Sequence, residues 1–476
     1  MLWRGTFLLL IGQALALLSG YGIQVFLART LEPEAYGTYG VVQSVLMIIE
    51  LIVVAGIPAA LRRFVGQSPE KGFALHKFLF KWQVSLAFIL FAAAFVFAPQ
   101  IADALNDHRL TPILRWAVVD IIFFAFYWYY NGFLTGQRRF AQQTLVVGIY
   151  TVSKFFLMVG VVSAGNHLVG AFVANFSASI VGWIAGVAVF KLEKSKGVAS
   201  KREMAKFIAP SILYSVGLNL FFYIDLWFVK YYAFPAEVGY YNVASALGRM
   251  PYFFSTALSG AIIPSLAFAI GKNDENETRK IVRQAMRVLL LVLCPACVLV
   301  VGDAETIIGF LFGAEYLAAA PILEVLFVGM CMLTFFSVLN AINIAKSGML
   351  TCGVIVLGVV VLDAGLNAWL TPKFYMQGAA WATTISMIFA LIASAIYVYK
   401  QYRLFLPFKS VLRVSLITIV FYLSTIWFET DKIWTFVLKA LGLLIFYLIA
   451  LRVTGELSAE EVQKMKSFTL RSGKKS

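Results

Sequence analysis

Arg249 lies in the middle of an apolar stretch, Tyr241 to Gly260, that is long enough to cross a membrane. A guanidinium at the centre of a bilayer costs about 3 kcal/mol on insertion scales, so it needs polar surroundings. Polar residues recur on one face of this helix at spacings of three and four, namely Asn242, Ser245, Arg249, Tyr252, Thr256 and Ser259. Such a stripe faces protein or water rather than lipid. Arg249 is therefore a candidate for contact with a substrate, and Pro251 predicts a bend beside it.

Similar polar positions occur on three other apolar stretches. A shift of 202 residues aligns Gly40, Gln43, Met47 and Glu50 with Asn242, Ser245, Arg249 and Tyr252. Asn219 continues a four-residue spacing from Ser211 and Ser215, and the first stretch of the chain carries Gln24. We expect the polar faces of these four helices to enclose one central polar cavity.

Further charges lie inside apolar stretches, at Asp120, Lys154, Asp225, Glu324 and Asp363. Lys154 and Asp363 fall at equivalent depths, and we expect them to face each other. Lys154 is the second candidate for substrate contact, whereas Glu50, Asp225 and Asp363 are candidates for ion coupling or gating. The alternative for each is a structural ion pair, such as Asp120 with Arg115, or a Lys439 that pairs or reaches the interface.

No sequence pattern indicates catalysis. There is no G-x-x-x-x-G-K-[ST] motif, so no ATP-driven motor is expected within the chain. The three histidines are scattered, and no spacing typical of metal ligands is present. We therefore predict a protein that is not an enzyme, with no catalytic residues, no metal site and no cofactor.

The composition predicts a membrane protein. The 476 residues are 61% hydrophobic and 13% charged, with a mean hydropathy of +0.84. Apolar runs of about 20 residues, the length that crosses a bilayer as a helix, recur about fourteen times. The first run lacks a small-residue cleavage site, so we expect it to remain as the first span. The fold class is predicted to be all-α.

The net charge of +15 follows the expected topology. Most of the 39 Lys and Arg lie at the N-terminus, in the loops after even-numbered spans and in the C-terminal tail. This asymmetry is the positive-inside rule, and it predicts a multi-pass protein of the cytoplasmic (inner) membrane with both termini in the cytoplasm. The basic balance therefore does not indicate binding to nucleic acid.

The two halves of the chain look related. PEAYGTYGVVQS, beginning at Pro33, is echoed by PAEVGYYNVASA, beginning at Pro235. Repeated spans of this kind are typical of transporters, whose substrate sites lie near the midplane. The charged segment from Lys191 to Phe207 is the expected linker. We predict an N-lobe at 1–206, a C-lobe at 207–405, and two extra spans with a tail at 406–476, where Ser458 to Glu461 predicts a short helix.

The segment VFLARTLEPEAYGTYGVVQSVLMIIELIVVAGIPAALRRFVG, Val25 to Gly66, resembles the opening of polysaccharide-transport proteins. These are the oligosaccharide flippases of the multidrug/oligosaccharidyl-lipid/polysaccharide exporter superfamily. The span layout, the basic central loop and the PAEVGYYNVA echo extend the resemblance over most of the chain. It implies two six-helix lobes in a V around a central cavity, plus the two C-terminal helices, and transport by alternating access.

The resemblance also implies a cargo, a polyprenyl-pyrophosphate-linked oligosaccharide flipped between leaflets for glycan export. Arg249 and Lys154 match the cationic cavity lining of some relatives and would contact the pyrophosphate. The sugars would then hydrogen-bond to Asn219, Gln24, Asn242 and Tyr252. Expected partners are the lipid-linked oligosaccharide, membrane lipids, coupling H⁺ or Na⁺, and glycan polymerase or assembly proteins.

Three alternatives stay open. An ion-coupled exporter of cationic drugs, from the same superfamily, would use Glu50, Asp225 and Asp363 instead. The neighbouring peptidoglycan-precursor flippases carry an arginine-rich first span, and the stretch FLLLIGQALALLSGYGIQVFLA has no arginine. A non-transporting assembly partner is disfavoured because no large soluble domain is expected.

Overall fold

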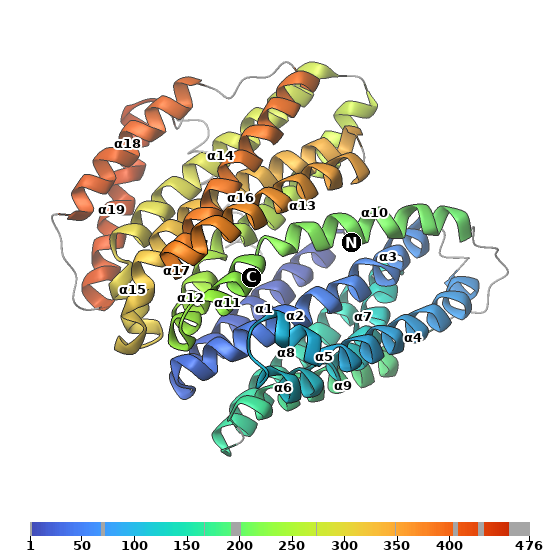
Figure 1. The fold of residues 1–476 in the computed structure, drawn as a ribbon. Helices are drawn as coiled ribbons and strands as arrows, with labels where there is room; N and C mark the ends of the chain where they lie inside the picture. Colours follow the sequence, from blue (N-terminus) through green and yellow to red (C-terminus); the bar gives the residue numbers. More distant parts are fainter. Residues whose placement is uncertain are drawn as a thin grey trace. The chain divides into compact units, whose positions relative to one another are not determined.

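The computed structural model describes residues 2–67, 72–165, 167–191, 201–272, 274–347, 349–402, 408–426 and 433–456. Helices account for nearly all of these residues, as Figure 1 shows. They are α1 (Leu2–Thr30), α2 (Pro33–Ala55), α3 (Ile57–Gln67), α4 (Gly72–Val96), α5 (Ala98–Ala104), α6 (Leu110–Ala117), α7 (Asp120–Gly136), α8 (Phe140–Ser163), α9 (His167–Val189), α10 (Lys201–Leu220), α11 (Ile224–Tyr232), α12 (Pro235–Gly248), α13 (Met250–Gly271), α14 (Glu275–Gly302), α15 (Ala304–Leu311), the 3₁₀ helix η2 (Ala314–Ala319), α16 (Ala320–Ser347), α17 (Met349–Tyr402), α18 (Phe408–Ile426) and α19 (Ile433–Val453). The all-α prediction is confirmed for this part of the chain.

The chain folds as two compact units. The first unit comprises Met1–Ala246 and Gly348–Ser386, and the second comprises Leu247–Ser347 and Met387–Ser476. Most of the expected linker, residues 192–200, and the expected tail helix after Ser458 lie outside the described residues. The predicted lobe boundaries stay a prediction.

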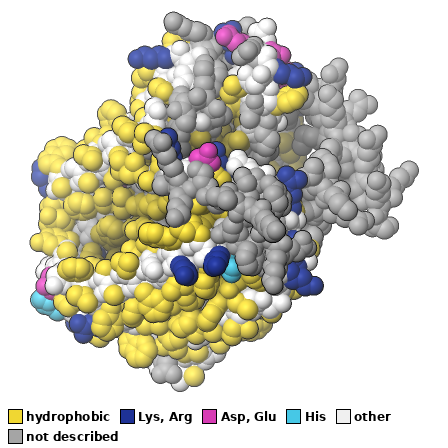
Figure 2. Space-filling model, turned by 90° about the vertical axis from the view of Figure 1, so that its right-hand side faces the viewer, with side chains coloured by type: hydrophobic (Ala, Val, Ile, Leu, Met, Phe, Trp, Pro, Cys, Tyr) yellow, Lys and Arg dark blue, Asp and Glu magenta, His cyan; other side chains and the backbone are white. Residues whose placement is uncertain are grey.

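The helices have the length and apolarity of membrane spans. Among the described residues, nine helices pass this test, or ten if the bent pair α10–α11 is one span. Large apolar side chains stand exposed on them, such as Phe156 at 67%, Ile89 at 64% and Val361 at 72%. Figure 2 shows hydrophobic side chains covering most of the described surface on one face. Water would penalise such a surface, but lipid would not, so the chain is a multi-pass membrane protein.

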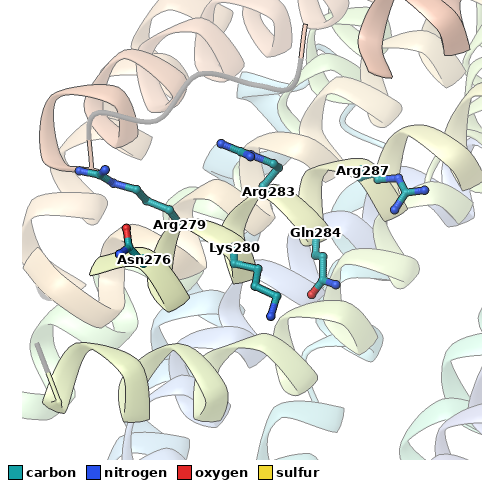
Figure 3. Close-up of a pocket in the computed structure, with 6 residues that line it drawn as sticks. All are labelled: Asn276, Arg279, Lys280, Arg283, Gln284 and Arg287. Carbon is teal, nitrogen blue, oxygen red and sulfur yellow. The ribbon is translucent and has the colours of Figure 1, made fainter. Parts of the chain in front are cut away.

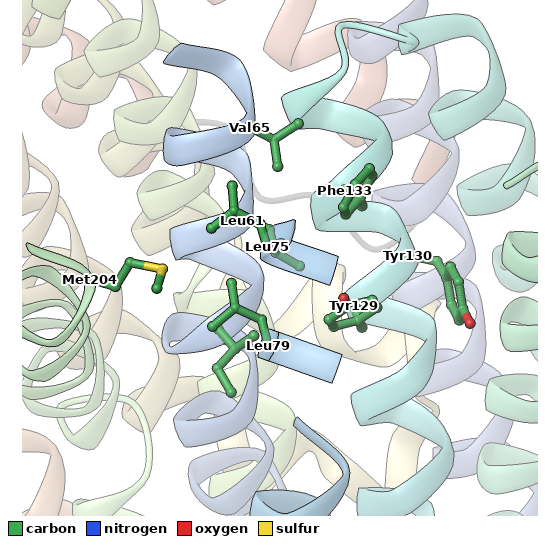
Figure 4. Packing of buried hydrophobic residues seen from close by; sticks show 9 residues of the cluster. Leu61, Val65, Leu75, Leu79, Tyr129, Tyr130, Phe133 and Met204 are labelled. Carbon is green, nitrogen blue, oxygen red and sulfur yellow. The ribbon is translucent and has the colours of Figure 1, made fainter. Parts of the chain in front are cut away.

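Inside the first unit, aromatic and branched side chains form a continuous core. Leu61 and Val65 of α3 pack against Tyr129 and Phe133 of α7, with Leu79 of α4 closing the cluster (Figure 4). All five are almost fully buried. Lipid tails are as apolar as leucine side chains, so excluding water does not drive helices together inside a bilayer. Close packing of these side chains therefore holds the helices together.

Several predicted spans are interrupted. The apolar stretch that carries Asn219 and Asp225 is divided into α10 and α11, which meet at an angle of 45°. The apolar stretch from Tyr241 to Gly260 is divided at Arg249, because Pro251 has no N–H to donate to the Leu247 carbonyl. The break that Pro251 predicts is therefore confirmed. The expectation of one continuous polar stripe through Arg249 is corrected, since α12 ends at Gly248 and α13 begins at Met250.

The last two helices of the predicted C-lobe form a hairpin within α17. The helix is interrupted at Tyr375, whose φ of 48° and ψ of −129° are not helical. A positive φ is strained for a tyrosine, so surrounding contacts must hold it. Next to it, Gly378 faces the Leu370 carbonyl so closely that a side chain at this position would collide. The hairpin brings Asp363 and Thr383, on its two arms, toward the same neighbour, Asp225.

The two sequence repeats meet in the first unit at equivalent positions. Both α2 and α12 begin at a proline, Pro33 and Pro235. A Cβ on Gly37 would lie 2.6 Å from the backbone nitrogen of Gly239, the residue that the repeat makes its equivalent. One on Gly239 would lie even closer to the Pro33 carbonyl oxygen. The positions that the sequence echo makes equivalent thus lie against each other where α2 and α12 meet.

We predict that Gly239→Ala destabilises the protein by about 2 kcal/mol, because the added methyl forces the two backbones apart. Thermal unfolding of the purified protein in detergent measures the change. Gly160→Ala is the matched control, since a Cβ there meets nothing within 4 Å. Equal midpoints for the two variants would contradict the close contact.

In the second unit, ion pairs fasten α14 to the two C-terminal helices at both ends. At one end, Lys439 Nζ of α19 lies 2.8 Å from Asp303 Oδ1, and both side chains are at most 6% exposed. At the other, Arg287 Nε lies 2.9 Å from Glu456 Oε1, and Arg413 of α18 approaches the same carboxylate. The structural pairing expected for Lys439 is confirmed.

Candidate functional site

Two carboxylates, Asp225 and Asp363, lie buried and close together in the first unit. Asp225 is the second residue of the short helix α11, and it is only 1% exposed. Its Oδ2 accepts a 2.7 Å hydrogen bond from the Tyr241 hydroxyl and a 3.4 Å one from Thr383 Oγ1, while Oδ1 accepts the Leu226 N–H at 2.7 Å. Asp363 of α17 is fully buried and within electrostatic range of Asp225. The break before Ile224 places Asp225 at a helix N-terminus, where a negative charge is favoured.

A ladder of polar groups extends from Asp363 along α17. Asn367 Nδ2 donates to Asp363 Oδ1 at 3.2 Å, and Thr371 Oγ1 donates to Asn367 Oδ1 at 3.2 Å. The spacing of four residues puts all three on one helix face, and each is fully buried. Asp225, Asp363 and Thr383 thus bring carboxyl and hydroxyl oxygens together from α11 and the two arms of α17. Carboxylate and hydroxyl oxygens suit a hard cation or a bound proton.

Among the residues that the structure describes, acidic, histidine and cysteine side chains form no group of three or more that could hold a metal ion. Asp225 and Asp363 contribute two negative charges at most. A single positive charge, shared between them, would relieve their mutual repulsion.

A second buried cluster joins Glu50 of α2, Asp120 of α7 and Lys154 of α8. The two carboxyl groups and the Lys154 ammonium lie within electrostatic range of one another. Asn175 Nδ2 of α9 donates a short hydrogen bond to Asp120 Oδ2. Glu50 and Asp120 are at most 4% exposed, so the cluster holds two acidic groups against one ammonium away from water. Lys154 thus lies beside Glu50 and Asp120, and Asp363 beside Asp225, rather than Lys154 facing Asp363.

An ion-pair network at the loop between α5 and α6 links three further segments. Lys230 Nζ of α11 lies 2.7 Å from Asp107 Oδ2, and Arg109 lies 3.0 Å from Asp107 Oδ1 and 3.1 Å from Glu34 Oε1 of α2. Burial alone would raise the pKa of Asp107, but the hydrogen bonds from Arg109 and Lys230 outweigh it and lower the pKa to about 2. The carboxylate is therefore ionised, and the network intact, at all physiological pH values.

The remaining predicted residues are distributed as follows. Gln24 Oε1 accepts a 2.7 Å hydrogen bond from the Tyr36 hydroxyl, and Asn242 Nδ2 donates to the Tyr36 carbonyl at 3.4 Å. Asn219 Nδ2 donates to the carbonyl one turn back, Ser215, at 3.0 Å. Arg249, at the junction of α12 and α13, and Tyr252 are half-buried. In this conformation, the Gln24 and Asn242 side chains form hydrogen bonds with Tyr36 of α2 and do not line an open cavity.

Sequence reasoning missed Tyr241, Asn367 and Thr383. Asn367 and Thr371 follow Asp363 at four-residue spacing, so a search for polar stripes beyond the first two spans of each half would have found them. Tyr241 and Thr383 carried no such signal. Their contact with Asp225 depends on the helix break before Ile224 and on the hairpin at Tyr375.

We predict that Lys154→Met destabilises the protein by about 3 kcal/mol, because it leaves two buried carboxyl groups without a cation. Thermal unfolding in detergent provides the measurement. Glu50→Gln in the Lys154→Met background is expected to recover part of the loss, since it removes one of the repelling groups. If Lys154→Met unfolds at the wild-type temperature, the ammonium is not paired with the cluster.

Comparison with protein families gives two matches. The family model described as "Polysaccharide biosynthesis protein" matches residues 2–270, more than half of the chain. The MatE family model matches residues 210–369. The first match confirms the resemblance inferred from Val25 to Gly66.

Individual proteins with similar sequences come from archaea. An uncharacterized membrane protein of Methanocaldococcus jannaschii is 25% identical over 327 residues, 63% of this chain and 64% of its own length. The chain thus spans slightly less than two thirds of that relative. A probable low-salt glycan biosynthesis flippase of Haloferax volcanii, Agl15, is 22% identical over 391 residues, covering 79% of this chain and 80% of its own.

Among solved structures, the lipid II flippase MurJ in an inward closed conformation is similar with a TM-score of 0.74. The match covers 94% of this chain and 98% of the MurJ chain at 16% sequence identity. At that identity, the likeness establishes a shared fold and nothing about the cargo.

Proposed function

The chain belongs to the polysaccharide biosynthesis protein family, and on that premise we propose that it is a flippase for a polyprenyl-pyrophosphate-linked oligosaccharide. The observation that carries the proposal is the family match over residues 2–270, which includes both copies of the repeat. The similarity to a probable glycan biosynthesis flippase over four fifths of that protein supports it.

The cargo contains a pyrophosphate and a sugar chain, and the lipid interior disfavours both. Arg249 is half-buried at a helix junction, and a guanidinium there can pair with phosphate oxygens through two parallel hydrogen bonds. Tyr252 and Asn219 would offer hydrogen bonds to sugar hydroxyls. Gln24 and Asn242 would do so only after the contacts with Tyr36 open, and Lys154 would contribute only on leaving Glu50 and Asp120.

Alternating access is proposed as the mechanism, with about fourteen spans in two lobes and two extra helices. Helix breaks at Phe221–Tyr223, Arg249 and Tyr375 supply places where helices can bend without unfolding. No chemical step is required, so the protein acts as a transporter and not as an enzyme. The expected setting is the cytoplasmic membrane, with both termini in the cytoplasm and glycan-assembly proteins as partners.

Asp225 and Asp363 are proposed to bind the coupling ion, Na⁺ or H⁺. The nearby oxygen atoms and the mutual repulsion favour one positive charge, and the ligands come from α11 and from both arms of α17. Binding of the ion would therefore stabilise one conformation over another. Glu50 and Asp120, balanced by one lysine, are proposed as a second proton-binding pair.

The second candidate function is ion-coupled export of a cationic compound. It is favoured by the MatE family match over residues 210–369, which contains both Asp225 and Asp363. In that case the buried carboxylates would bind the exported cation directly, and Arg249 would have no role in substrate contact.

We predict that Arg249→Ala slows translocation of the lipid-linked oligosaccharide at least tenfold, because a charge-assisted hydrogen bond contributes about 1.5–3 kcal/mol. Proteoliposomes containing the labelled lipid, sampled for headgroup exposure over time, give the rate. Lys81→Ala, which removes an exposed positive charge on α4, is the matched control. Wild-type rates for Arg249→Ala would restrict this arginine to a structural role. Uptake of a cationic dye, with no lipid translocation by the wild type, would favour the exporter.

For ion coupling, we predict that Asp363→Asn abolishes the dependence of transport on an imposed Na⁺ or H⁺ gradient, because the amide keeps the shape but not the charge. The wild type is tested with each gradient separately to identify the ion. Glu305→Gln, which neutralises an exposed carboxylate, should retain full dependence. Gradient-dependent transport by Asp363→Asn would show that the ion binds elsewhere.

A further inference from the structure

A cationic cavity lies along the first half of α14 in the second unit. It has a volume of about 380 Å³ and is lined by Asn276, Arg279, Lys280, Arg283, Gln284 and Arg287. Figure 3 shows these side chains following one another along the helix. Of the lining residues in the described part of the chain, four are cationic and none is acidic.

The arginines are regularly spaced. Arg279, Arg283 and Arg287 recur every four residues, so they project from one face of α14, about 6 Å apart along its axis. Lys280 and Gln284 occupy the adjoining side. A topology signal requires positive charge near the span but neither a four-residue spacing nor arginine. Membrane orientation alone therefore does not explain the four-residue spacing of the arginines.

The three arginines differ in how strongly they are engaged. Arg287 is fixed by the almost fully buried Glu456 and belongs to the fastening of α14. Arg279 lies 3.0 Å from Glu275, whose side chain is 80% exposed, and such surface pairs contribute little and exchange readily. Arg283 is exposed, and no ion pair to it occurs among the described residues. Arg279 and Arg283 are thus available to an anion, while Arg287 holds the helix in place.

The cavity lies where the apolar part of the span begins. Val288 directly follows Arg287, and the sequence from Val288 to Gly302 carries no charge. With the expected orientation, this boundary is at the headgroup level of the inner leaflet. An anion that reaches this level while attached to a lipid is a phosphate, and the planar guanidinium matches phosphate oxygens in pairs.

We propose that the α14 cavity binds the phosphate group of a lipid headgroup in the inner leaflet. Arg279 and Arg283 would hold the phosphate oxygens, with Lys280 adding charge and Gln284 and Asn276 adding hydrogen bonds. The phosphate can come from an anionic phospholipid or from the pyrophosphate of a lipid-linked cargo waiting to enter. The first source is independent of the proposed function, whereas the second rests on it.

The test is lipid binding to the purified full-length protein, measured by native mass spectrometry as probe lipids are titrated. The probes are phosphatidylglycerol and a polyprenyl pyrophosphate, with zwitterionic phosphatidylcholine for comparison. The variant Arg279→Gln/Lys280→Gln/Arg283→Gln removes the cations proposed to bind the phosphate, two of which form exposed pairs with Glu275 and Glu277, and leaves Arg287 with Glu456. Lys81→Gln controls for loss of exposed charge, and Arg279→Lys/Arg283→Lys keeps the charge without the planar fork. Thermal unfolding checks that each variant is folded.

We expect the triple variant to bind at least one of the two anionic probes five- to tenfold more weakly, with Lys81→Gln unchanged. A loss confined to phosphatidylglycerol identifies a phospholipid site, and a loss confined to the pyrophosphate identifies a cargo site. Unchanged binding of both probes by a folded triple variant overturns the proposal. Because no translocation is measured, a failure here is distinct from a failure of the flippase assay.

Discussion

A charged group inside an apolar helix bundle must find its counter-charge or hydrogen-bond donors within the protein, because lipid offers neither. This requirement determines which helices pack together. Lys439 pairs with Asp303, and Lys154 lies near Glu50 and Asp120. Asp225 accepts hydrogen bonds from the hydroxyl groups of Tyr241 and Thr383 and from a backbone N–H. Each association links segments far apart in the sequence. The charges that seem costly in each span taken alone are the groups that specify tertiary structure.

A second constraint is the close approach of backbones at the repeat. Gly37 and Gly239 allow α2 and α12 to touch without side chains between them, and Asn242 packs against Gly40 three residues further along. Around this contact the Tyr36 hydroxyl engages Gln24, and the Trp227 indole donates to Ser44 Oγ at 2.7 Å. Small residues and inter-helix hydrogen bonds are the usual means of association in membranes. Here they join α2 to α12, the helices that carry the two echoing segments.

Much of the architecture could be predicted from the sequence, because membrane-spanning helices are recognised by the length and apolarity of their sequences. The break at Pro251 and the isolation of Asp225 and Asp363 within apolar stretches were readable in the same way. The partners of those charges were not. Asp225 meets Tyr241 and Thr383 only because α10 and α11 bend by 45° and α17 turns back at Tyr375. A prediction from residue periodicity assumes that each span is a straight helix. For that reason it expected Lys154 to face Asp363 and one continuous polar stripe to pass through Arg249.

The Lys439–Asp303 pair also has a bearing on how the protein is made. The ribosome synthesises Asp303 136 residues before Lys439, so α14 enters the membrane long before its partner exists. Until then the carboxylate must remain hydrated at the membrane surface or take up a proton. Insertion of α19 supplies the missing ammonium and draws Asp303 into the dry interior. The packing of α14 is thus completed by a helix that is synthesised much later.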